Sequence, residues 1–164
     1  MNVGVDLRQV RPVSTGGTWI FFRELVQALV GSSPGDAFRL FQTRDDAPML
    51  PPHAAVTVEP IGPDEPRGAV DERAVALGLD VLVRAFPAGF HGFPPERQVV
   101  FVPDLQHDFL PELFPPDVRR DRCRRFGAAL GHAGAIATVS EFSRRTILAH
   151  PERRCRDVFV SAGG

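Results

Sequence analysis

Five polar side chains follow one short apolar run near the middle of the chain, and their types could support acid, base or hydrogen-bond chemistry. They are Asp104, Gln106, His107, Asp108 and Glu112. The run before them, Gln98–Val102, is rich in β-branched residues and is closed by Pro103, which predicts a buried parallel strand. Because ligands of open α/β sheets bind beyond the carboxyl ends of the strands, we expect this polar segment to line a ligand site.

The same segment has two other interpretations. It could be a solvated loop whose carboxylates cap the next helix, which is the plainer structural role. Asp104, His107 and Asp108 could also be combined into a metal site, but the sequence contains no regular metal-ligand spacing and no Ser-His-Asp pattern. We therefore predict that the protein holds no metal.

A pair of glycines, Gly16 and Gly17, precedes a predicted helix at about Trp19–Val30. Glycine lets a ligand approach the backbone closely, and a helix N-terminus offers free N–H groups to an anion, so the pair could cradle a phosphate. The pattern is neither G-x-G-x-x-G nor a P-loop, since its lysine is missing. A plain glycine turn is the alternative.

A third candidate segment follows the predicted strand Ala135–Val139. Ser140 is well placed to N-cap a helix that runs to about His150, and Glu141 and Arg144 lie in its first turns. Their position just after a strand again favours the ligand-binding edge of a sheet. A simple helix cap is the alternative interpretation of Ser140.

The remaining elements that must position these side chains alternate along the chain. Further strands are predicted at Asn2–Asp6, Ala37–Gln42, Ala54–Pro60, Asp80–Arg84 and Arg156–Ser161, and further helices at Val70–Leu79 and Asp117–Gly131. In the first helix, Phe22, Leu25, Val26 and Leu29 should face the core. Strands that alternate with helices predict an α/β fold, a doubly wound and mostly parallel sheet of six or seven strands with helices on both faces. Val99–Val102 and Ile136–Val139 should be central and buried.

Composition limits the classes of function. The chain has 164 residues, a net charge of −1 and 43% hydrophobic residues, which suits one globular domain and gives no reason to expect a nucleic-acid partner. All 19 basic residues are arginine, which excludes a Walker lysine and a Schiff-base lysine. Cys123 and Cys155 have no pairing pattern and predict free thiols. No membrane-spanning run or signal peptide is visible, so we expect a soluble, cytoplasmic protein.

Three segments, taken in order, resemble the N-terminal half of a family 4 retaining glycosyltransferase, which has the two-domain GT-B fold. They read NVGVDLR…STGGTWIFFRELVQAL, VVFVPDLQHDFLPELFPP and AIATVSEFSRRTI, and together they span most of the chain. The resemblance implies that Gly16 and Gly17 face the donor diphosphate and that the loop from Asp104 lines the acceptor side. It also implies that the segment with Ser140, Glu141 and Arg144 borders the same cleft.

The sequence departs from the family pattern at two points. Many members carry a histidine immediately before the aspartate, where this chain has Pro103, so His107 is the nearest candidate to join Asp104 as a catalytic residue. Residues 1–164 correspond to a single Rossmann-like acceptor-side domain, whereas the family has a second domain that binds the nucleotide-sugar. We therefore expect that domain to be absent and the chain not to be active alone.

The resemblance implies hexosyl transfer from a nucleotide-sugar to a hydroxyl acceptor, without a metal or another cofactor. It also implies peripheral contact with anionic lipid at the inner face of the membrane, because Asp117–Arg125 carries five arginines against two aspartates. A solvated helix face is the alternative for that stretch. Two other functions stay open: a non-catalytic module that binds a sugar or phosphate ligand, and an unrelated domain of the same fold that reads a phosphorylated ligand.

Overall fold

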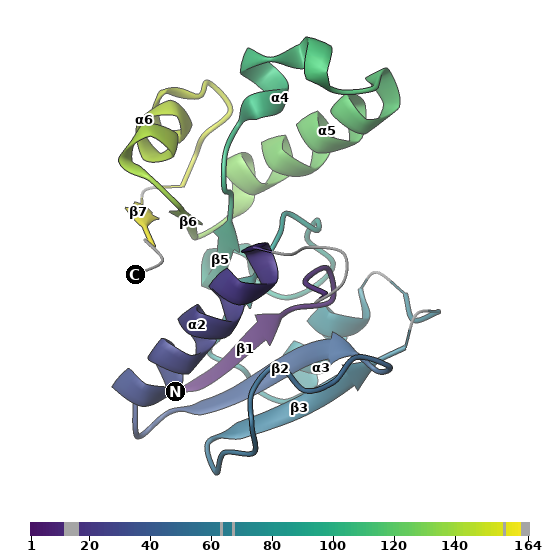
Figure 1. Ribbon diagram of the computed structural model, residues 1–164, viewed down its shortest axis with the longest axis vertical. Helices are drawn as coiled ribbons and strands as arrows, with labels where there is room; N and C mark the ends of the chain where they lie inside the picture. Colours follow the sequence, from purple (N-terminus) through teal and green to yellow (C-terminus); the bar gives the residue numbers. More distant parts are fainter. Residues whose placement is uncertain (12–16, 63, 67, 156, 162–164) are drawn as a thin grey trace. The chain divides into compact units, whose positions relative to one another are not determined.

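The computed structural model describes residues 1–11, 17–62, 64–66, 68–155 and 157–161 (Figure 1). The strands are β1 Asn2–Asp6, β2 Ala37–Thr43, β3 Val56–Ile61, β4 Val81–Arg84, β5 Gln98–Phe101, β6 Ala135–Thr138 and β7 Asp157–Val160. The α-helices are α2 Gly17–Ser32, α3 Ala69–Ala76, α4 Gln106–Phe109, α5 Pro116–His132 and α6 Glu141–Ala149, with 3-10 turns η1 Pro95–Arg97 and η2 Pro111–Leu113. Among the described residues, no helix is both long and apolar enough to cross a bilayer.

The strands form a seven-stranded sheet in the order β3-β2-β1-β4-β5-β6-β7. The pairings β1·β2, β1·β4, β2·β3, β5·β6 and β6·β7 are all parallel. The predicted α/β class and parallel sheet are therefore confirmed. The chain divides into two compact units. The first unit contains Met1–Ala85 and His91–Phe93, and the second contains Phe86–Phe90 and Pro94–Ala162.

In the first unit, helices lie on opposite faces of the strands, with α2 on one side and α3 on the other (Figure 1). Close packing on the α3 side explains one glycine of β1. A Cβ added at Gly4 would lie 2.5 Å from Leu79 Cδ1 and 3.2 Å from a ring carbon of Phe41. A larger residue would push this packing apart, because a well-packed core has no space for an extra carbon.

The buried face of α2 differs in part from the predicted one. Phe22 and Val26 are fully buried as expected, but the third buried residue is Val30, while Leu25 and Leu29 are half-buried. The helix extends to Ser32, two residues beyond the predicted end, and therefore includes Val30. The three buried residues are spaced by four and form the stripe that faces the sheet.

The second unit has its own core. Side chains from β5, β6, β7 and the helices α5 and α6 meet in it: Val100, Val102, Leu105, Phe126, Ala129, Leu130, Ala133, Ile136, Ile147, Cys155 and Val158. The start of β6 requires glycine, because a Cβ at Gly134 would overlap the carbonyl oxygen of Glu96 just before β5. The Gly134 N–H also donates to Pro95 O at 2.8 Å, which fixes the approach of the two strands.

The prediction of two central, buried strands holds with one correction. Val100, Val102 and Ile136 are buried, and neither β5 nor β6 is an edge strand. Val139, however, is 41% exposed, and Val99 is only half-buried. The reason is that β6 ends at Thr138, so Val139 belongs to the turn that leads beyond the sheet edge into α6.

Candidate functional site

Asp104 lies just beyond the carboxyl end of β5, and its carboxylate is held in place from two sides. Its Oδ1 accepts a hydrogen bond from the Gln106 N–H at 3.0 Å. This bond closes a short turn that leads into α4. It also accepts one from Arg122 Nη2 of α5 at 3.4 Å. The side chain is 36% exposed, so the carboxylate is fixed in orientation and still reachable by a ligand.

Arg122 owes its position to two aromatic rings. Its guanidinium lies 4.9 Å from the centre of the Phe114 ring and 5.0 Å from that of Phe126, and its side chain is 25% exposed. Two cation–π contacts, together with the hydrogen bond to Asp104, hold this side chain more firmly than a surface ion pair alone would. The interpretation of the arginine-rich segment as a solvated face therefore does not hold for Arg122.

His107 is buried, whereas its polar sequence neighbours suggested a solvated loop. It is 2% exposed in the four-residue helix α4, with its ring edge-on to Phe126 at 4.8 Å between centres. Burial lowers the pKa of His107, and Asp108 opposes this shift while Arg122 reinforces it. The ring is therefore neutral near pH 7, and a substrate could reach it only if α4 moved.

Ser140 N-caps α6, as the plainer interpretation of its position predicted. Its Oγ accepts a hydrogen bond from the Ser143 N–H at 3.1 Å. Arg144 Nη1 donates to Glu141 Oε2 at 3.3 Å, and Arg144 Nε donates to Val158 O of β7 at 2.8 Å. Glu141 is exposed, so of this group it is the side chain most open to a ligand.

Two of the three predicted segments lie at one edge of the second unit. Strands β5 and β6 are parallel neighbours, so Asp104 and Ser140 both follow carboxyl ends at the same edge. The Thr138 Oγ1 donates to Pro103 O at 3.3 Å and links the two strand ends. Contact of these residues with an acceptor stays a prediction.

The glycine pair belongs to the first unit. Gly16 lies outside the described residues, and Gly17 is the first residue of α2. A Cβ at Gly17 would meet no atom within 4 Å, so the space beside this backbone is open. The first turn of α2 contains no acidic side chain that would compete with an anion for its N–H groups. Their contact with a donor diphosphate also stays a prediction.

A buried ion network at the carboxyl ends of β1 and β4 was not predicted. Arg84 donates to Asp6 Oδ2 at 3.1 Å and to Asp71 Oδ1, and all three side chains are at most 6% exposed. Arg8 adds a two-pronged contact to Asp6, with both distances 2.9 Å. A charged last residue on two otherwise apolar strands was the signal that could have indicated it.

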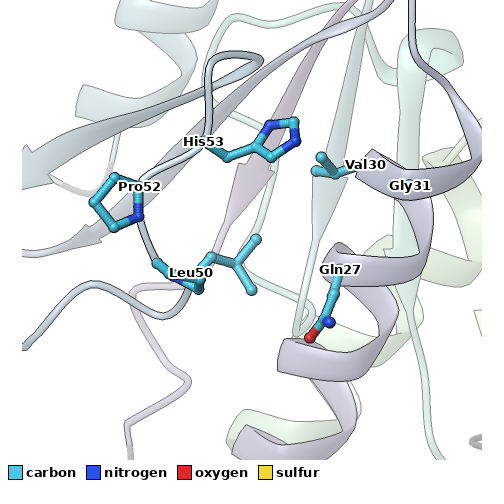
Figure 2. Close-up of a pocket in the computed structure, with 7 residues that line it drawn as sticks. Gln27, Val30, Gly31, Leu50, Pro52 and His53 are labelled. Atoms are coloured by element: carbon cyan, nitrogen blue, oxygen red, sulfur yellow. The ribbon is translucent and has the colours of Figure 1, made fainter.

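The first unit also contains a cavity of about 230 Å³. It is lined by the last turns of α2 and by the segment before β3: Gln27, Val30, Gly31, Leu50, Pro51, Pro52 and His53. Figure 2 shows the Leu50 and His53 side chains directed toward the helix that carries Val30. Because a helix binds anions at its N-terminus, this cavity at the C-terminal end of α2 is not the predicted phosphate site.

Three side chains of metal-ligand type meet where α4 packs on α5. They are His107, Asp108 and Cys123. Each offers one ligand atom, and these three atoms all lie within 4.8 Å of one another. Cys123 is a free thiol of intermediate exposure, and the second cysteine, Cys155, is free and buried, as the sequence predicted.

Comparison with known proteins supports the fold. No family model matches the chain, and no curated protein matches it. Among solved structures it is similar to a chain of a sucrose-phosphate synthase from Thermosynechococcus elongatus. The match has a TM-score of 0.59 and 11% identity, and covers 100% of this chain and 90% of that one. At this identity the likeness establishes a shared Rossmann-like α/β fold.

Proposed function

We propose that the chain is the acceptor-side domain of a retaining glycosyltransferase of family 4. The observation that carries the proposal is the position of the three segments of the resemblance. Two of them lie in the second unit and end in polar residues after β5 and after β6, at the carboxyl ends where open parallel sheets bind ligands. The other lies in the first unit, where Gly17 begins α2. The whole-chain likeness to a sucrose-phosphate synthase, itself a glycosyltransferase, supports the same class of enzyme.

The proposed reaction moves a hexosyl group from a nucleotide-sugar to a hydroxyl acceptor. The acceptor oxygen forms a bond to the anomeric carbon on the face that the diphosphate leaves, the bond from that carbon to the phosphate oxygen breaks, and the departing phosphate takes the acceptor's proton. Such a reaction depends on positioning and charge stabilisation more than on a protein nucleophile.

Asp104 is the residue that we place against the acceptor. Its carboxylate can accept a hydrogen bond from an acceptor hydroxyl while Arg122 and the Gln106 N–H hold it in place. Ser140, Glu141 and Arg144 would border the same acceptor site. Gly16 and Gly17 would let the diphosphate approach the N-terminus of α2, where unpaired N–H groups and the helix dipole favour negative charge.

His107 receives a different role from the one that the resemblance implied. The family histidine is replaced by Pro103, and His107 is 2% exposed and packed on Phe126. We therefore propose that His107 is a positioning residue, which holds α4 and the adjoining Asp104 turn against α5. Direct contact with the transferred sugar would need a different arrangement of α4.

A second candidate function is a binding module without chemistry. The proline at 103 and the buried His107 favour it, because neither supplies a group to the transferred sugar. Both candidate functions include binding of a sugar or phosphate ligand, and only the first includes transfer of a sugar.

Acceptor binding can be tested directly by NMR titration of the protein with mono- and disaccharides. We expect weak binding that shifts amide signals near Asp104 and is reduced at least several-fold in Asp104→Asn. The matched control is Glu96→Gln, an exposed carboxylate in η1 before the start of β5. Binding that is equal in both variants, or absent from the wild type for every sugar, would count against the proposal.

A further inference from the structure

The cluster of His107, Asp108 and Cys123 has the composition of a transition-metal site. A histidine nitrogen, a carboxylate oxygen and a thiolate sulfur are the three ligand types that Zn²⁺ uses in proteins. Two of them come from α4 and the third from the third turn of α5, and these helices pack against each other (Figure 1). The ligand atoms lie within 4.8 Å of one another, and His107 Nε2 is 3.8 Å from Asp108 Oδ1.

A bound ion would require these ligand atoms to lie closer together. Two ligands bound to zinc at about 2.0–2.3 Å and at the tetrahedral angle lie roughly 3.3–3.7 Å apart. The observed separations of up to 4.8 Å are wider, so the Asp108 and Cys123 side chains must rotate toward His107, and their partial exposure leaves them room to do so.

The burial of His107 is the second, independent observation. The side chain is 2% exposed, yet its Nδ1 has no hydrogen-bond partner among the described residues, and its Nε2 lies beyond hydrogen-bond distance from Asp108. A buried polar side chain without a partner is costly and normally indicates a ligand or an ordered water. Burial also keeps the ring neutral, which is the form that binds a metal.

Asp108 is oriented by a second histidine. His150 Nδ1 accepts a hydrogen bond from the Glu152 N–H at 3.2 Å, so its neutral ring carries the proton on Nε2. That Nε2 lies 3.5 Å from Asp108 Oδ2. One carboxylate oxygen thus faces a histidine N–H, while the other faces His107, which is the arrangement that outer partners give to metal-binding carboxylates.

The charges around the cluster permit a divalent cation. A thiolate and a carboxylate together carry two negative charges, which match a divalent ion. Two of the nearby arginines have partners of their own, since Arg122 Nη2 contacts Asp104 and Arg119 Nε donates to His107 O at 3.1 Å. Cys123 also lines a cavity of about 480 Å³ together with Arg119 and Arg120, through which a water ligand could enter.

We propose that His107, Asp108 and Cys123 bind one Zn²⁺ ion, with water in the fourth position. The ion joins α4 to α5 and so fixes the turn that carries Asp104. This inference stands apart from the proposed transfer reaction, in which the metal takes no part. It revises the expectation of no metal, which came from the absence of a regular ligand spacing in the sequence.

The test uses the purified 164-residue protein, stripped with a chelator and titrated with Co²⁺ as a spectroscopic substitute for Zn²⁺. We expect one ion per chain, a thiolate-to-metal charge-transfer band and visible bands of tetrahedral intensity, all displaced by Zn²⁺. Cys123→Ser should abolish the charge-transfer band, and Asp108→Asn should weaken binding by about 10-fold or more. His150→Gln should weaken it by about 10–100-fold, the range for outer partners of a metal ligand.

The matched control is Cys155→Ser, which alters the other free cysteine and should leave the charge-transfer band intact. Circular dichroism of each variant establishes that it is folded, and Asp108→Asn remains a test of the site if Cys123→Ser does not fold. A protein that binds no Co²⁺, a band that survives Cys123→Ser, or equal loss in Cys155→Ser would each overturn the proposal.

Discussion

Replacement of Arg84 by methionine tests the buried ion network at the ends of β1 and β4. Arg84 is 1% exposed and contacts Asp6 and Asp71, which are 6% and 0% exposed. Methionine preserves much of the volume but removes the positive charge, so two buried carboxylates lose a common partner. Removal of one member of a buried ion pair costs about 3–5 kcal/mol, because it leaves an uncompensated buried charge.

The structure favours the lower end of that range. Asp71 Oδ2 still accepts from the N–H groups of His91 and Phe93, at 2.9 and 3.2 Å, and Asp6 keeps its contact with Arg8. We therefore expect Arg84→Met to lower the free energy of unfolding by about 3 kcal/mol. For a chain of this size the melting temperature should fall by roughly 6–12 °C.

Urea unfolding followed by circular dichroism measures this loss. The matched control is Arg39→Met on the neighbouring strand β2. Arg39 pairs with Glu59, but the two side chains are 36% and 20% exposed, so the change should cost less than about 1 kcal/mol. If Arg84→Met were no more destabilising than Arg39→Met, the reasoning that burial makes the network essential would be refuted.

Two further predictions concern the second unit. The pKa of His107 is lowered in the folded protein, so below about pH 6.5 the unfolded chain binds the proton more readily and stability falls as pH falls. The free energy of unfolding of the metal-free protein is measured at about pH 7.5 and about pH 5.5. It should fall more on acidification for the wild type than for His107→Gln, and equal falls would contradict this prediction. Phe109 and Leu113 are 59% and 64% exposed beside the arginine-rich start of α5, so the protein should co-sediment with anionic vesicles at low salt and Leu113→Ser should reduce binding. No sedimentation, or equal sedimentation with zwitterionic vesicles, would end the idea of membrane contact.

Most strands were predictable because they are short apolar or alternating runs closed by proline, glycine or charge. Gln98–Phe101 and Ala135–Thr138 ended one residue before the predicted limits, since the last valine of each run already belongs to the following turn. The cap at Ser140 was predictable for the same local reason: a serine before a helix satisfies an N–H that the helix itself cannot.

Burial within the candidate site was not predictable. A four-residue helix is too short to show a periodic apolar face, so nothing local distinguishes buried His107 from its solvated neighbours. Its environment is set by Phe126, which lies on the next helix, and the same ring also orders Arg122. Contacts between residues that far apart in sequence depend on how two helices pack, which composition and spacing do not specify.

The central claim, that this chain supplies the acceptor side of a glycosyltransferase, is tested most directly by sugar transfer. The chain is assayed alone and joined to a nucleotide-sugar-binding domain, with released nucleoside diphosphate and glycosylated product both measured. We expect no transfer by the chain alone, because the reacting centre forms only when two domains close, and we expect transfer by the joined protein. Asp104→Asn should lower that rate by at least about 10-fold and Gly17→Ala should lower it without loss of folding, since a Cβ at Gly17 meets no protein atom within 4 Å. Rapid transfer by the isolated chain, or a joined protein that binds donor and acceptor but transfers nothing, would contradict the account.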